Sequence, residues 1–451
     1  MPSDHSSHIS HDSAALSRSG PAPESSELSL SAPQTPAPSA LPLSALSRAQ
    51  NCLVAGALGD ALGYAVEFDS WQAIRAEHGP QGIQELQINS VGEAFCSDDT
   101  QMTLFLQEGL LLSSGPDDDL DSARQAFLEW RKTQHEPQAQ TAPALRSEMA
   151  KKESNLWRAQ APGMTCLSAL GAGGLGTMAH PINDSKGCGG VMRAAPAAFV
   201  GFWRENWTAR QAWTLGAEQA ALTHGHPEGW ASSGAAAALV FELLRGQPLR
   251  ASAATALSLT DELAAGRAPL TVALGQKALG LDAANPLSPK ALVEALGLGW
   301  VGEEAFAIGL YGALVAEAST AANGLRIAAN HSGDSDSTAS IAGQFLGAAG
   351  LADDWVMQNE SALDLIGAID FCHKALIQRA HDALGMDATQ ALAEAFSGPL
   401  AEGQTPEALA TPEQKPAPRH GFNMAALADE AESLKEKGSL IVQHFRRKLG
   451  L

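Results

Sequence analysis

Residues 97–112, SDDTQMTLFLQEGLLL, and residues 334–350, DSDSTASIAGQFLGAAG, share one pattern: acidic and hydroxyl side chains followed directly by an apolar segment. Ser and Asp favour helix starts because their side chains accept hydrogen bonds from free backbone N–H groups. Both stretches therefore predict a helix that begins within the acidic cluster. Apolar residues recur at helical spacing elsewhere, and no run of alternating apolar and polar residues predicts a strand. The pattern favours an all-α fold.

The composition favours the same fold class and excludes several kinds of partner. Ala and Leu dominate the apolar residues and only 5% of the chain is aromatic, a balance typical of helices. The chain has 29 Lys and Arg against 50 Asp and Glu, so its net charge is −21. This charge argues against nucleic acid or an anionic membrane as a partner. No segment approaches the roughly 18 uninterrupted apolar residues that suggest a membrane span.

Cysteine usage and the N-terminal sequence indicate a cytoplasmic protein. The N-terminus is polar and lacks the basic and apolar regions of a secretory signal. Five cysteines are scattered along the chain without a CxxC pair, which favours a reducing compartment over a disulfide framework. They are Cys52, Cys96, Cys166, Cys188 and Cys372.

The sequence predicts three parts. Residues 1–43 are rich in Ser and Pro and are expected to form a disordered arm, either a dispensable tail or a segment that orders on a partner. Residues 44–398 form a helical domain, and residues 399–451 a Pro/Ala linker followed by a helix near 423–448. Within the domain, helices are predicted at 44–67, 97–112, 121–134, 208–221, 229–245, 251–265, 289–298, 303–323, 336–351 and 360–383. A connector rich in Gln, Pro and Gly is expected up to about residue 183.

The two acidic clusters contain more carboxylates than helix capping uses. Capping needs one or two such side chains, whereas Asp98, Asp99, Asp334 and Asp336 occupy just two helix starts. The apolar segments that follow predict burial, and buried carboxylates brought together need a counter-charge. Oxygen ligands favour a hard cation, Mg²⁺ or Mn²⁺, over zinc. From these residues alone, capping and a divalent-metal site both stay open.

Two other interpretations of residues 334–338 fail. DSDST fits the D-x-D-x-T pattern of phosphotransferases that form an aspartyl-phosphate, but that pattern needs a buried apolar strand before it, and AANHSG precedes it here. An EF-hand loop starting at Asp334 would need Gly at its sixth position and Glu at its twelfth. Ala339 and Phe345 stand there.

Three further segments contain candidate functional residues. Residues 185–196, SKGCGGVMRAAP, hold clustered glycines that allow a ligand to approach the backbone, or form an ordinary tight loop. His224 and His226 lie in THGHPEGW, where hydrogen-bonded structure is the commoner role of such a pair. Glu67 ends the first predicted helix, in GALGDALGYAVEF (56–68), whose small residues Gly56, Gly59 and Gly63 permit close helix packing.

Taken in order, these motifs resemble the ADP-ribosylglycohydrolase family. The resemblance covers about residues 48–350 and extends to about 395. It is carried by GALGDALGYAVEF (56–68), SDDTQMTL (97–104), WRKTQ (130–134), APGMTCLSAL (161–170), SKGCGGVMRAAP (185–196), THGHPEGW (223–230) and NHSGDSDSTASIAGQFLGA (330–348). The SDDT and GDSDS motifs at this separation are the specific part. Many members have Asn-Gly-Ser where this chain has Cys188-Gly189-Gly190, so contacts that the Asn would make are in doubt here.

The resemblance implies an all-α orthogonal multi-helix bundle with a binuclear Mg²⁺ or Mn²⁺ site at the base of a cleft. Its metal ligands correspond to Ser97, Asp98, Asp99, Asp334, Asp336 and Ser337. Regions that contact ADP-ribose correspond to Gly187, Cys188, Gly189, Gly190, Met192, His224, Ser332 and Gly333. Glu67 corresponds to a glutamate beside substrate or metal.

The resemblance also suggests the reaction, hydrolysis of the bond between ADP-ribose and a protein side chain. Asp334 is predicted to position or deprotonate the water, and Glu67 to assist near the scissile bond. ADP-ribosyl-arginine is the favoured substrate, with serine-linked or free ADP-ribose derivatives as alternatives. A hypothesis of a different class is an immunity protein that binds and occludes an ADP-ribosyltransferase through its N-terminal arm. The net charge of −21 suits a basic partner.

Overall fold

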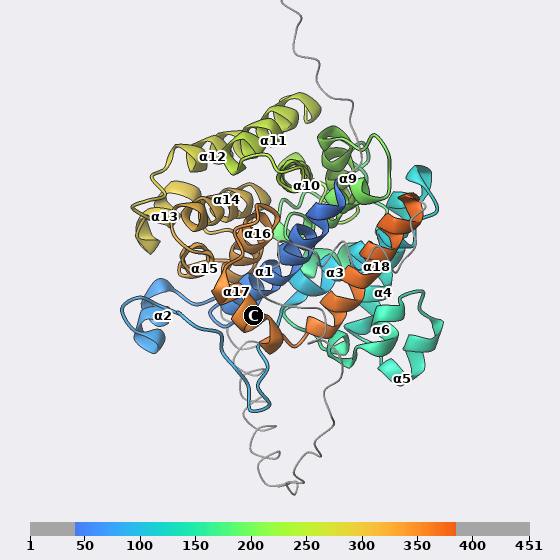
Figure 1. Cartoon of the computed structure of the whole chain (residues 1–451), viewed down its shortest axis with the longest axis horizontal. Helices are drawn as coiled ribbons and strands as arrows, with labels where there is room; N and C mark the ends of the chain where they lie inside the picture. Colours follow the sequence, from blue (N-terminus) through green and yellow to red (C-terminus); the bar gives the residue numbers. More distant parts are fainter. Residues whose placement is uncertain (1–40, 385–451) are drawn as a thin grey trace, which may run out of the picture. The chain divides into compact units, whose positions relative to one another are not determined.

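The computed structural model describes residues 41–384, so residues 1–40 of the predicted arm and the predicted linker and C-terminal helix lie outside it. Residues 41–43, predicted as the end of the arm, belong to the domain instead: Leu41 is 3% exposed and its N–H donates to the Gly201 carbonyl at 2.8 Å. The elements of the structure are helices joined by loops (Figure 1), and within the described range the only strand-like pairings are two isolated bridges. The predicted all-α fold is confirmed. No helix within residues 41–384 combines the length and apolar character that crossing a membrane requires.

The helices of five or more residues are α1 (Leu46–Tyr64), α2 (Trp71–His78), α3 (Asp98–Leu111), α4 (Asp119–Thr133), α6 (Glu148–Lys152), α7 (Met164–Gly171), α9 (Ala209–Ala221), α10 (Pro227–Leu244), α11 (Leu249–Leu263), α12 (Pro269–Gly280), α13 (Pro289–Leu296), α14 (Gly302–Ala318), α15 (Ala321–Ala329), α16 (Ser335–Ala348), α17 (Asp354–Asn359) and α18 (Ile366–Leu384). Most predicted helices have a counterpart within a few residues of the expected bounds.

The structure corrects the prediction in five places, and one of them is helix α17 (Asp354–Asn359), which the sequence did not predict. The helix predicted at 303–323 is two helices, because α14 ends at Ala318 and Thr320 caps α15 through its side chain. Helix α2, capped by Ser70, and helix α12, which opens with Pro269, were not predicted. The connector before residue 183 contains short helices, α7 among them.

Helices α1 and α16 pack so closely that their backbones touch, as the small residues of the first predicted helix indicate. A Cβ added at Gly59 would lie 2.1 Å from the Ala339 carbonyl oxygen, and one at Gly63 would lie 2.1 Å from the Ser335 carbonyl oxygen. In the other direction, a Cβ at Gly343 would lie 1.9 Å from the Ala55 oxygen. Only glycine fits at these positions. The C-terminal end of α1 is thereby fixed against the N-terminal end of α16.

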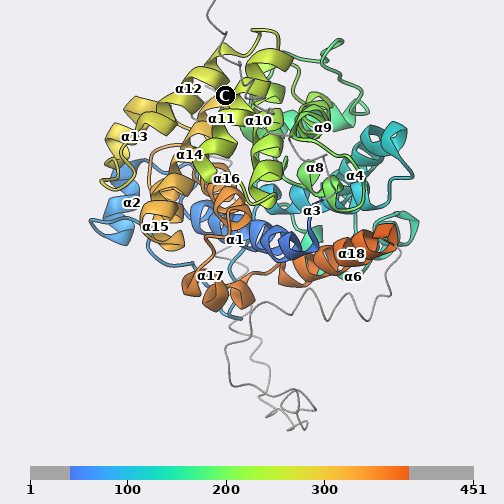
Figure 2. The ribbon, with the colours of Figure 1, turned by 45° about the horizontal axis from the view of Figure 1, so that its top comes forward.

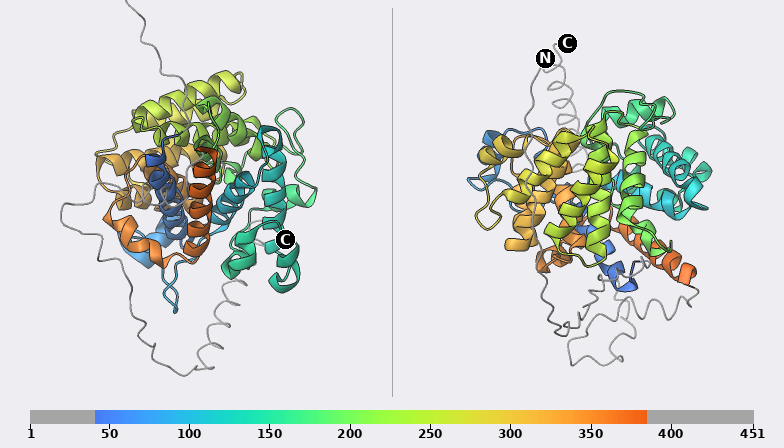
Figure 3. Two further views of the ribbon diagram at one scale, coloured as in Figure 1. Left: turned by 45° about the vertical axis from the view of Figure 1, so that its right-hand side comes forward. Right: turned by 90° about the horizontal axis from the view of Figure 1, so that it is seen from above.

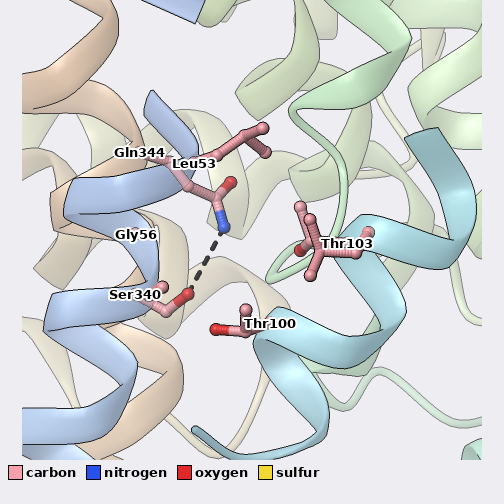
Figure 4. Close-up of a pocket in the computed structure, with 8 residues that line it drawn as sticks. Leu53, Gly56, Thr100, Thr103, Ser340 and Gln344 are labelled. Atoms are coloured by element: carbon pink, nitrogen blue, oxygen red, sulfur yellow. Dashed lines mark hydrogen bonds between the residues drawn. The ribbon is translucent and has the colours of Figure 1, made fainter. Parts of the chain in front are cut away.

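The other helices surround this pair. Figures 2 and 3 show α18 beside α1, and α14 beside α16. Helix α3 meets α1 and α16 at a small junction lined by Thr100, Thr103, Ser340 and Gln344, where the Gln344 amide donates to the Ser340 hydroxyl (Figure 4). The Gln344 amide also donates to the Met192 carbonyl, 2.5 Å away. The start of α3 and the loop that ends at Met192 are in this way positioned against the α1–α16 pair.

Candidate functional site

Six carboxylates converge where the C-terminal end of α1 meets the N-terminal ends of α3 and α16. Five of them are at most 5% exposed, while Glu67, just after α1, is partly buried. We call the six the carboxylate cluster: Asp60, Glu67, Asp98, Asp99, Asp334 and Asp336. The predicted Glu67 and the four predicted metal-binding aspartates are thus brought together from segments up to about 270 residues apart in the sequence.

Capping of α3 is provided by Ser97 and Asp60. The Ser97 hydroxyl oxygen accepts from the Asp99 N–H at 3.2 Å, and the Asp60 carboxylate accepts from the N–H groups of Ser97 and Thr100 and from the Thr100 hydroxyl. The two aspartates at the start of α3 have other partners. Asp98 accepts from the Gly163 N–H at 3.1 Å, and Asp99 Oδ1 accepts from the Ser337 hydroxyl at 3.3 Å. Capping therefore leaves the Asp98 and Asp99 carboxylates free for another role.

The start of α16 presents two more carboxylates to the same place. Asp334 Oδ1 accepts from the Ser337 N–H, and Asp334 Oδ2 accepts from the Cys188 thiol at 2.8 Å. Asp336 Oδ1 also accepts from the Ser337 N–H, at 2.8 Å. One oxygen from each of Glu67, Asp334 and Asp336 lies within 4.8 Å of the other two, an arrangement that can hold a metal ion.

The carboxylate cluster lacks a counter-charge within the described part of the chain. None of its members forms an ion pair there. The nearby Arg193 is fully buried, but its guanidinium donates to Gln219, Thr223 and Cys166 and lies over the Phe127 ring instead. The cluster thus gathers acidic groups with which no Lys, Arg or His of residues 41–384 forms an ion pair.

Burial is the largest cause of a raised pKa at every member of the cluster. Neighbouring carboxylates add to the rise, most directly at Asp336, Glu67 and Asp99. For Asp60 the two causes raise the pKa to about 7. Without a cation, the cluster is therefore driven to hold protons, whereas a bound cation would favour the ionised form of each carboxylate.

The residues present fit a hard divalent cation. Two carboxylate oxygens, Glu67 Oε2 and Asp99 Oδ2, are buried without a hydrogen-bond partner. Such buried oxygens carry a free-energy penalty that a cation removes. Apart from the Cys188 thiol, the side-chain atoms near these two oxygens that could bind a metal are carboxylate and hydroxyl oxygens, the ligands that Mg²⁺ and Mn²⁺ prefer. The hydroxyls are those of Ser97 and Ser337, 0% and 3% exposed.

The predicted Gly-rich loop lies against the segment that links α13 to α14. Gly187 forms an antiparallel bridge with Val301, and the Cys188 N–H donates to the Trp300 carbonyl at 3.3 Å. These pairings place the Cys188 thiol beside Asp334. Gly190 and Met192 are buried further along the loop, and Met192 Sδ lies 3.9 Å from the Ser337 hydroxyl.

His224 lies behind this loop. A Cβ at Gly189 would lie 3.0 Å from the His224 ring, and one at Gly187 would lie 3.4 Å from its Nε2. Burial lowers the pKa of His224 to about 3, and its Nδ1 is 2.8 Å from the Thr223 hydroxyl. His224 is thus a neutral, buried imidazole that packs against the loop, with its Nε2 next to Gly187 and Gly189.

Ser332 and Gly333, directly before Asp334, contact two other segments of the chain, the start of α2 and the loop at Leu298. The Ser332 hydroxyl oxygen accepts from the Trp71 N–H at 2.8 Å, which fixes the start of α2, just after the Glu67 segment. Gly333 has φ of +147°, and a Cβ there would lie 2.0 Å from the Leu298 carbonyl oxygen, so glycine is required. The next N–H, of Asp334, donates to that same oxygen at 2.9 Å.

Sequence reasoning missed three parts of the site. Asp60 was overlooked, although a single charged residue within the apolar run GALGDALG is itself a signal of a buried role. Arg193 was quoted only as part of a motif. The segment around Leu298 and Trp300 was placed at a helix end, and no local pattern in GLGW reveals that it contacts both the Gly-rich loop and the start of α16.

An all-α fold with a buried carboxylate cluster at three converging helix ends defines a candidate metalloenzyme. The chain belongs to the ADP-ribosylglycohydrolase family, whose model matches residues 41–381. This confirms the family suggested by the motifs. Membership supports an ADP-ribosyl hydrolase type of activity and metal dependence. No curated protein matches the chain. Among solved structures, a chain of an ADP-ribosylglycohydrolase-related protein complex is similar, with 21% identity and a TM-score of 0.46; the match covers 75% of this chain and 99% of that chain.

Proposed function

We propose that the protein is a metal-dependent hydrolase that removes ADP-ribose from modified protein side chains, with ADP-ribosyl-arginine as its substrate. The observation that carries this proposal is the carboxylate cluster itself, which gathers six acidic side chains without an ion pair among the described residues. Such a cluster is unfavourable in a folded protein unless a cation compensates its charge. Family membership connects the cluster with ADP-ribosyl chemistry.

Two Mg²⁺ or Mn²⁺ ions are the proposed cofactors. Ser97, Asp98, Asp99, Asp334, Asp336 and Ser337 would hold them. When bound, such ions orient the ribose hydroxyls and lower the pKa of a coordinated water. Asp99 and Ser337 connect the two halves of the site, because the Ser337 hydroxyl donates to Asp99 Oδ1 across the α3–α16 junction.

Asp334 is the proposed group that positions the attacking water and takes up its proton. The Ser337 N–H holds one of its oxygens and the Cys188 thiol the other, so the carboxylate has a fixed orientation. Fixed placement of a base relative to its reaction partner contributes directly to rate. Asp336 is less suited to this role because its only predicted role is to bind the metal.

Glu67 is the proposed assistant near the scissile bond. It lies on the loop after α1 rather than within a helix, and its buried Oε2 has no partner among the described residues. Burial first and then the charges of Asp336 and Asp334 raise its pKa well above the ordinary value. A carboxyl group whose pKa is raised is better suited to donating a proton to a leaving group, as glycoside hydrolysis requires.

The loop of Gly187, Cys188, Gly189 and Gly190, with Met192, His224, Ser332 and Gly333, forms the proposed ADP-ribose contact region. Gly187, Cys188 and Gly189 are partly exposed, so their backbone groups are accessible to a ligand. The departure from the common Asn-Gly-Ser pattern replaces an amide side chain by the Cys188 thiol. The substrate would therefore rely on backbone N–H groups here.

The test is release of ADP-ribose from an arginine-ADP-ribosylated protein, measured with Mg²⁺, with Mn²⁺ and with chelator. The wild type, Asp334→Asn and Asp282→Asn are compared, the last as a control because Asp282 lies in an exposed turn between α12 and α13. We expect metal-dependent release in the wild type and the control, and a loss of at least about a hundredfold in Asp334→Asn. A folded wild type that releases nothing with either metal would overturn the proposal for arginine, and serine-linked substrate would then be tested.

Binding to an ADP-ribosyltransferase is the second proposed role, supported by the net charge of −21. The N-terminal arm that would occlude the transferase lies outside the described residues. Deletion of residues 1–40, which keeps the buried Leu41, separates the two roles, since hydrolysis would persist and occlusion would weaken.

A further inference from the structure

We propose that Tyr64 is a positioning residue for the metal site: through Gln160, its hydroxyl holds residues 158–163 against the start of α3 and so fixes the Asp98 carboxylate. We call residues 158–163 the Gln160 segment. The inference rests on the proposed metal-binding role of Asp98, but not on any particular substrate. It adds to the candidate site a residue that acts through another residue and not by contact with the metal.

The Gln160 segment is bonded to Asp98 at two points. The Asp98 N–H donates to the Gln160 carbonyl at 2.9 Å, and the Gly163 N–H donates to Asp98 Oδ2 at 3.1 Å. Further along α3, the Gln101 amide donates to the Arg158 carbonyl at 3.0 Å. Because both the backbone and the carboxylate of Asp98 are bonded to the segment, a shift of the segment would move that carboxylate.

The backbone of the Gln160 segment does not favour this position by itself. Ala161 has φ of +48°, in the left-handed region that residues with a Cβ rarely adopt. Such a conformation costs free energy and persists only where surrounding contacts impose it. Gly163 is exposed, and Ala161 and Pro162 are only partly buried, so packing supports the segment weakly. Hydrogen bonds to the neighbouring helices therefore carry much of the support.

Tyr64 provides such a bond from α1. Its hydroxyl donates to Gln160 Oε1 at 3.0 Å. Tyr64 is the last residue of α1 and directly follows Gly63, where an added Cβ would lie 2.1 Å from the Ser335 carbonyl oxygen. The tyrosine thus projects from backbone that is fixed against the start of α16. The hydrogen bond therefore connects the Gln160 segment with the helix that carries Asp336.

This connection matters because the proposed ligands come from different helices. Asp98 lies on α3 and Asp336 on α16. Mg²⁺ demands near-ideal octahedral geometry, with oxygen ligands at about 2.0–2.1 Å. Partners that orient a metal ligand contribute about 10- to 100-fold to metal affinity. Loss of the Tyr64 hydroxyl should therefore weaken metal binding although the hydroxyl itself binds no metal.

The test compares the full-length wild type with Tyr64→Phe and with the control Tyr311→Phe. Tyr311 is the other of the two tyrosines in the chain. Its hydroxyl accepts from the Leu287 N–H and donates to the Asp282 carbonyl, in the connection between α12 and α13. Both variants keep the aromatic ring, and the control removes two hydrogen bonds that do not involve the Gln160 segment.

Two measurements report the position of Asp98. In hydrogen exchange without metal, the Asp98 and Gly163 amides of Tyr64→Phe should exchange about fivefold faster than in the wild type, the factor that one net hydrogen bond provides. In calorimetric titration, the Kd for Mg²⁺ should rise about tenfold, the lower end of the range for a lost outer partner. Tyr311→Phe should lower Tm at least as much as Tyr64→Phe and leave both measurements unchanged. A merely structural role of Tyr64 would lower Tm without this change in Mg²⁺ affinity.

Gln160→Met is a second variant, which removes the acceptor of the same hydrogen bond. If the hydroxyl acts through Gln160, the double variant Tyr64→Phe/Gln160→Met should bind Mg²⁺ no more weakly than the weaker single variant. Additive losses would overturn the route through Gln160.

The outcomes separate this inference from the proposed function. Unchanged exchange at Asp98 and Gly163 in Tyr64→Phe would overturn the inference, and so would faster exchange with an unchanged Kd for Mg²⁺. A wild type that binds no Mg²⁺ would instead contradict the proposed cofactors, while the exchange rates would still decide whether Tyr64 holds Asp98. Absence of ADP-ribose release would affect neither measurement.

Discussion

Gly63→Ala should separate the two helices that carry the site. The added Cβ would lie 2.1 Å from the Ser335 carbonyl oxygen and 2.6 Å from Asp336 Cα. A carbon–oxygen contact normally needs about 3.3 Å, so α1 and α16 must move apart by about 1 Å at this point. The obstacle is backbone, which cannot rotate away as a side chain can. Asp336 would therefore move relative to Asp98 and Asp99 on α3.

Two opposing free-energy changes set the effect on stability. Overpacking costs about 1–3 kcal/mol, and a clash with backbone belongs at the upper end. Alanine is favoured over glycine within a helix by about 1 kcal/mol, which offsets part of that cost. At an unfolding entropy of about 2.1 cal/mol/K per residue, a net loss of about 2 kcal/mol lowers Tm by about 3 °C in a domain of this size. Displacement of one ligand by about 1 Å should also lower the rate of ADP-ribose release about a hundredfold.

Gly280→Ala is the matched control, because Gly280 also ends a helix and a Cβ there meets no atom within 4 Å. Thermal unfolding, Mg²⁺ titration and ADP-ribose release are measured on both variants and the wild type. Gly280→Ala should match the wild type in Mg²⁺ titration and ADP-ribose release, and its Tm should equal or slightly exceed that of the wild type because alanine favours the helix. A Gly63→Ala variant with wild-type Tm and Mg²⁺ affinity would refute the argument that glycine at this position holds the site together.

Four further predictions follow from the carboxylate cluster and the arm. Saturating Mg²⁺ should raise Tm, with about 2.7 kcal/mol of added stability at 100 times Kd, and Asp336→Asn should lose most of that rise in a thermal shift assay; an equal rise in both would contradict the ligand role. Because burial and the charge of Asp336 raise the pKa of Asp60 to about 7, the folded metal-free protein binds more protons than the unfolded chain between about pH 4 and 7. Its stability should therefore fall as pH rises through that window, and chemical unfolding in chelator that shows no such fall would refute the assignment. Asp60→Ala should lower stability by about 2–3 kcal/mol, because the N–H groups at the start of α3 lose their acceptor; Asp60→Asn should lose less, and equal losses would show that charge rather than capping matters. Deletion of residues 1–40, which stops short of the buried Leu41, should leave ADP-ribose release unchanged, while weaker protection against a cognate transferase would support the occlusion role.

The sequence predicted those parts of the site that depend on local pattern. Ser97 and Asp334 were expected at helix starts because capping chemistry is encoded within three or four residues, and each side chain caps its helix. Close packing of the first helix followed from the spacing of Gly56, Gly59 and Gly63. Its partner could not be read from that spacing, because α16 lies about 280 residues further along the chain.

Tertiary pairings account for what the sequence did not predict. Asp60 lies in mid-helix, and its role appears only when the start of α3 meets it. The contact of Cys188 with Trp300 joins two loops more than a hundred residues apart, each of which resembles an ordinary turn. Helices α2 and α12 did have local signals, the Ser70 cap and Pro269 at a helix start, but their apolar faces are short and irregular.

The close packing of α1 and α16 buries a site with which no positive side chain of residues 41–384 forms an ion pair. Because no Lys or Arg among the described residues pairs with the carboxylate cluster, we expect a bound ion to supply the missing charge. The free energy spent on burying the carboxylates is then recovered when that ion binds, which couples metal affinity to stability. Substitutions that loosen the α1–α16 contact should weaken both together, whereas Asp334→Asn and Asp336→Asn should relieve repulsion in the metal-free protein while lowering its affinity for metal. In the metal-free protein, the first class of variants should therefore unfold more easily than the wild type, and the two Asn variants less easily. This result would confirm that repulsion within the carboxylate cluster, and not the packing around it, destabilises the metal-free protein.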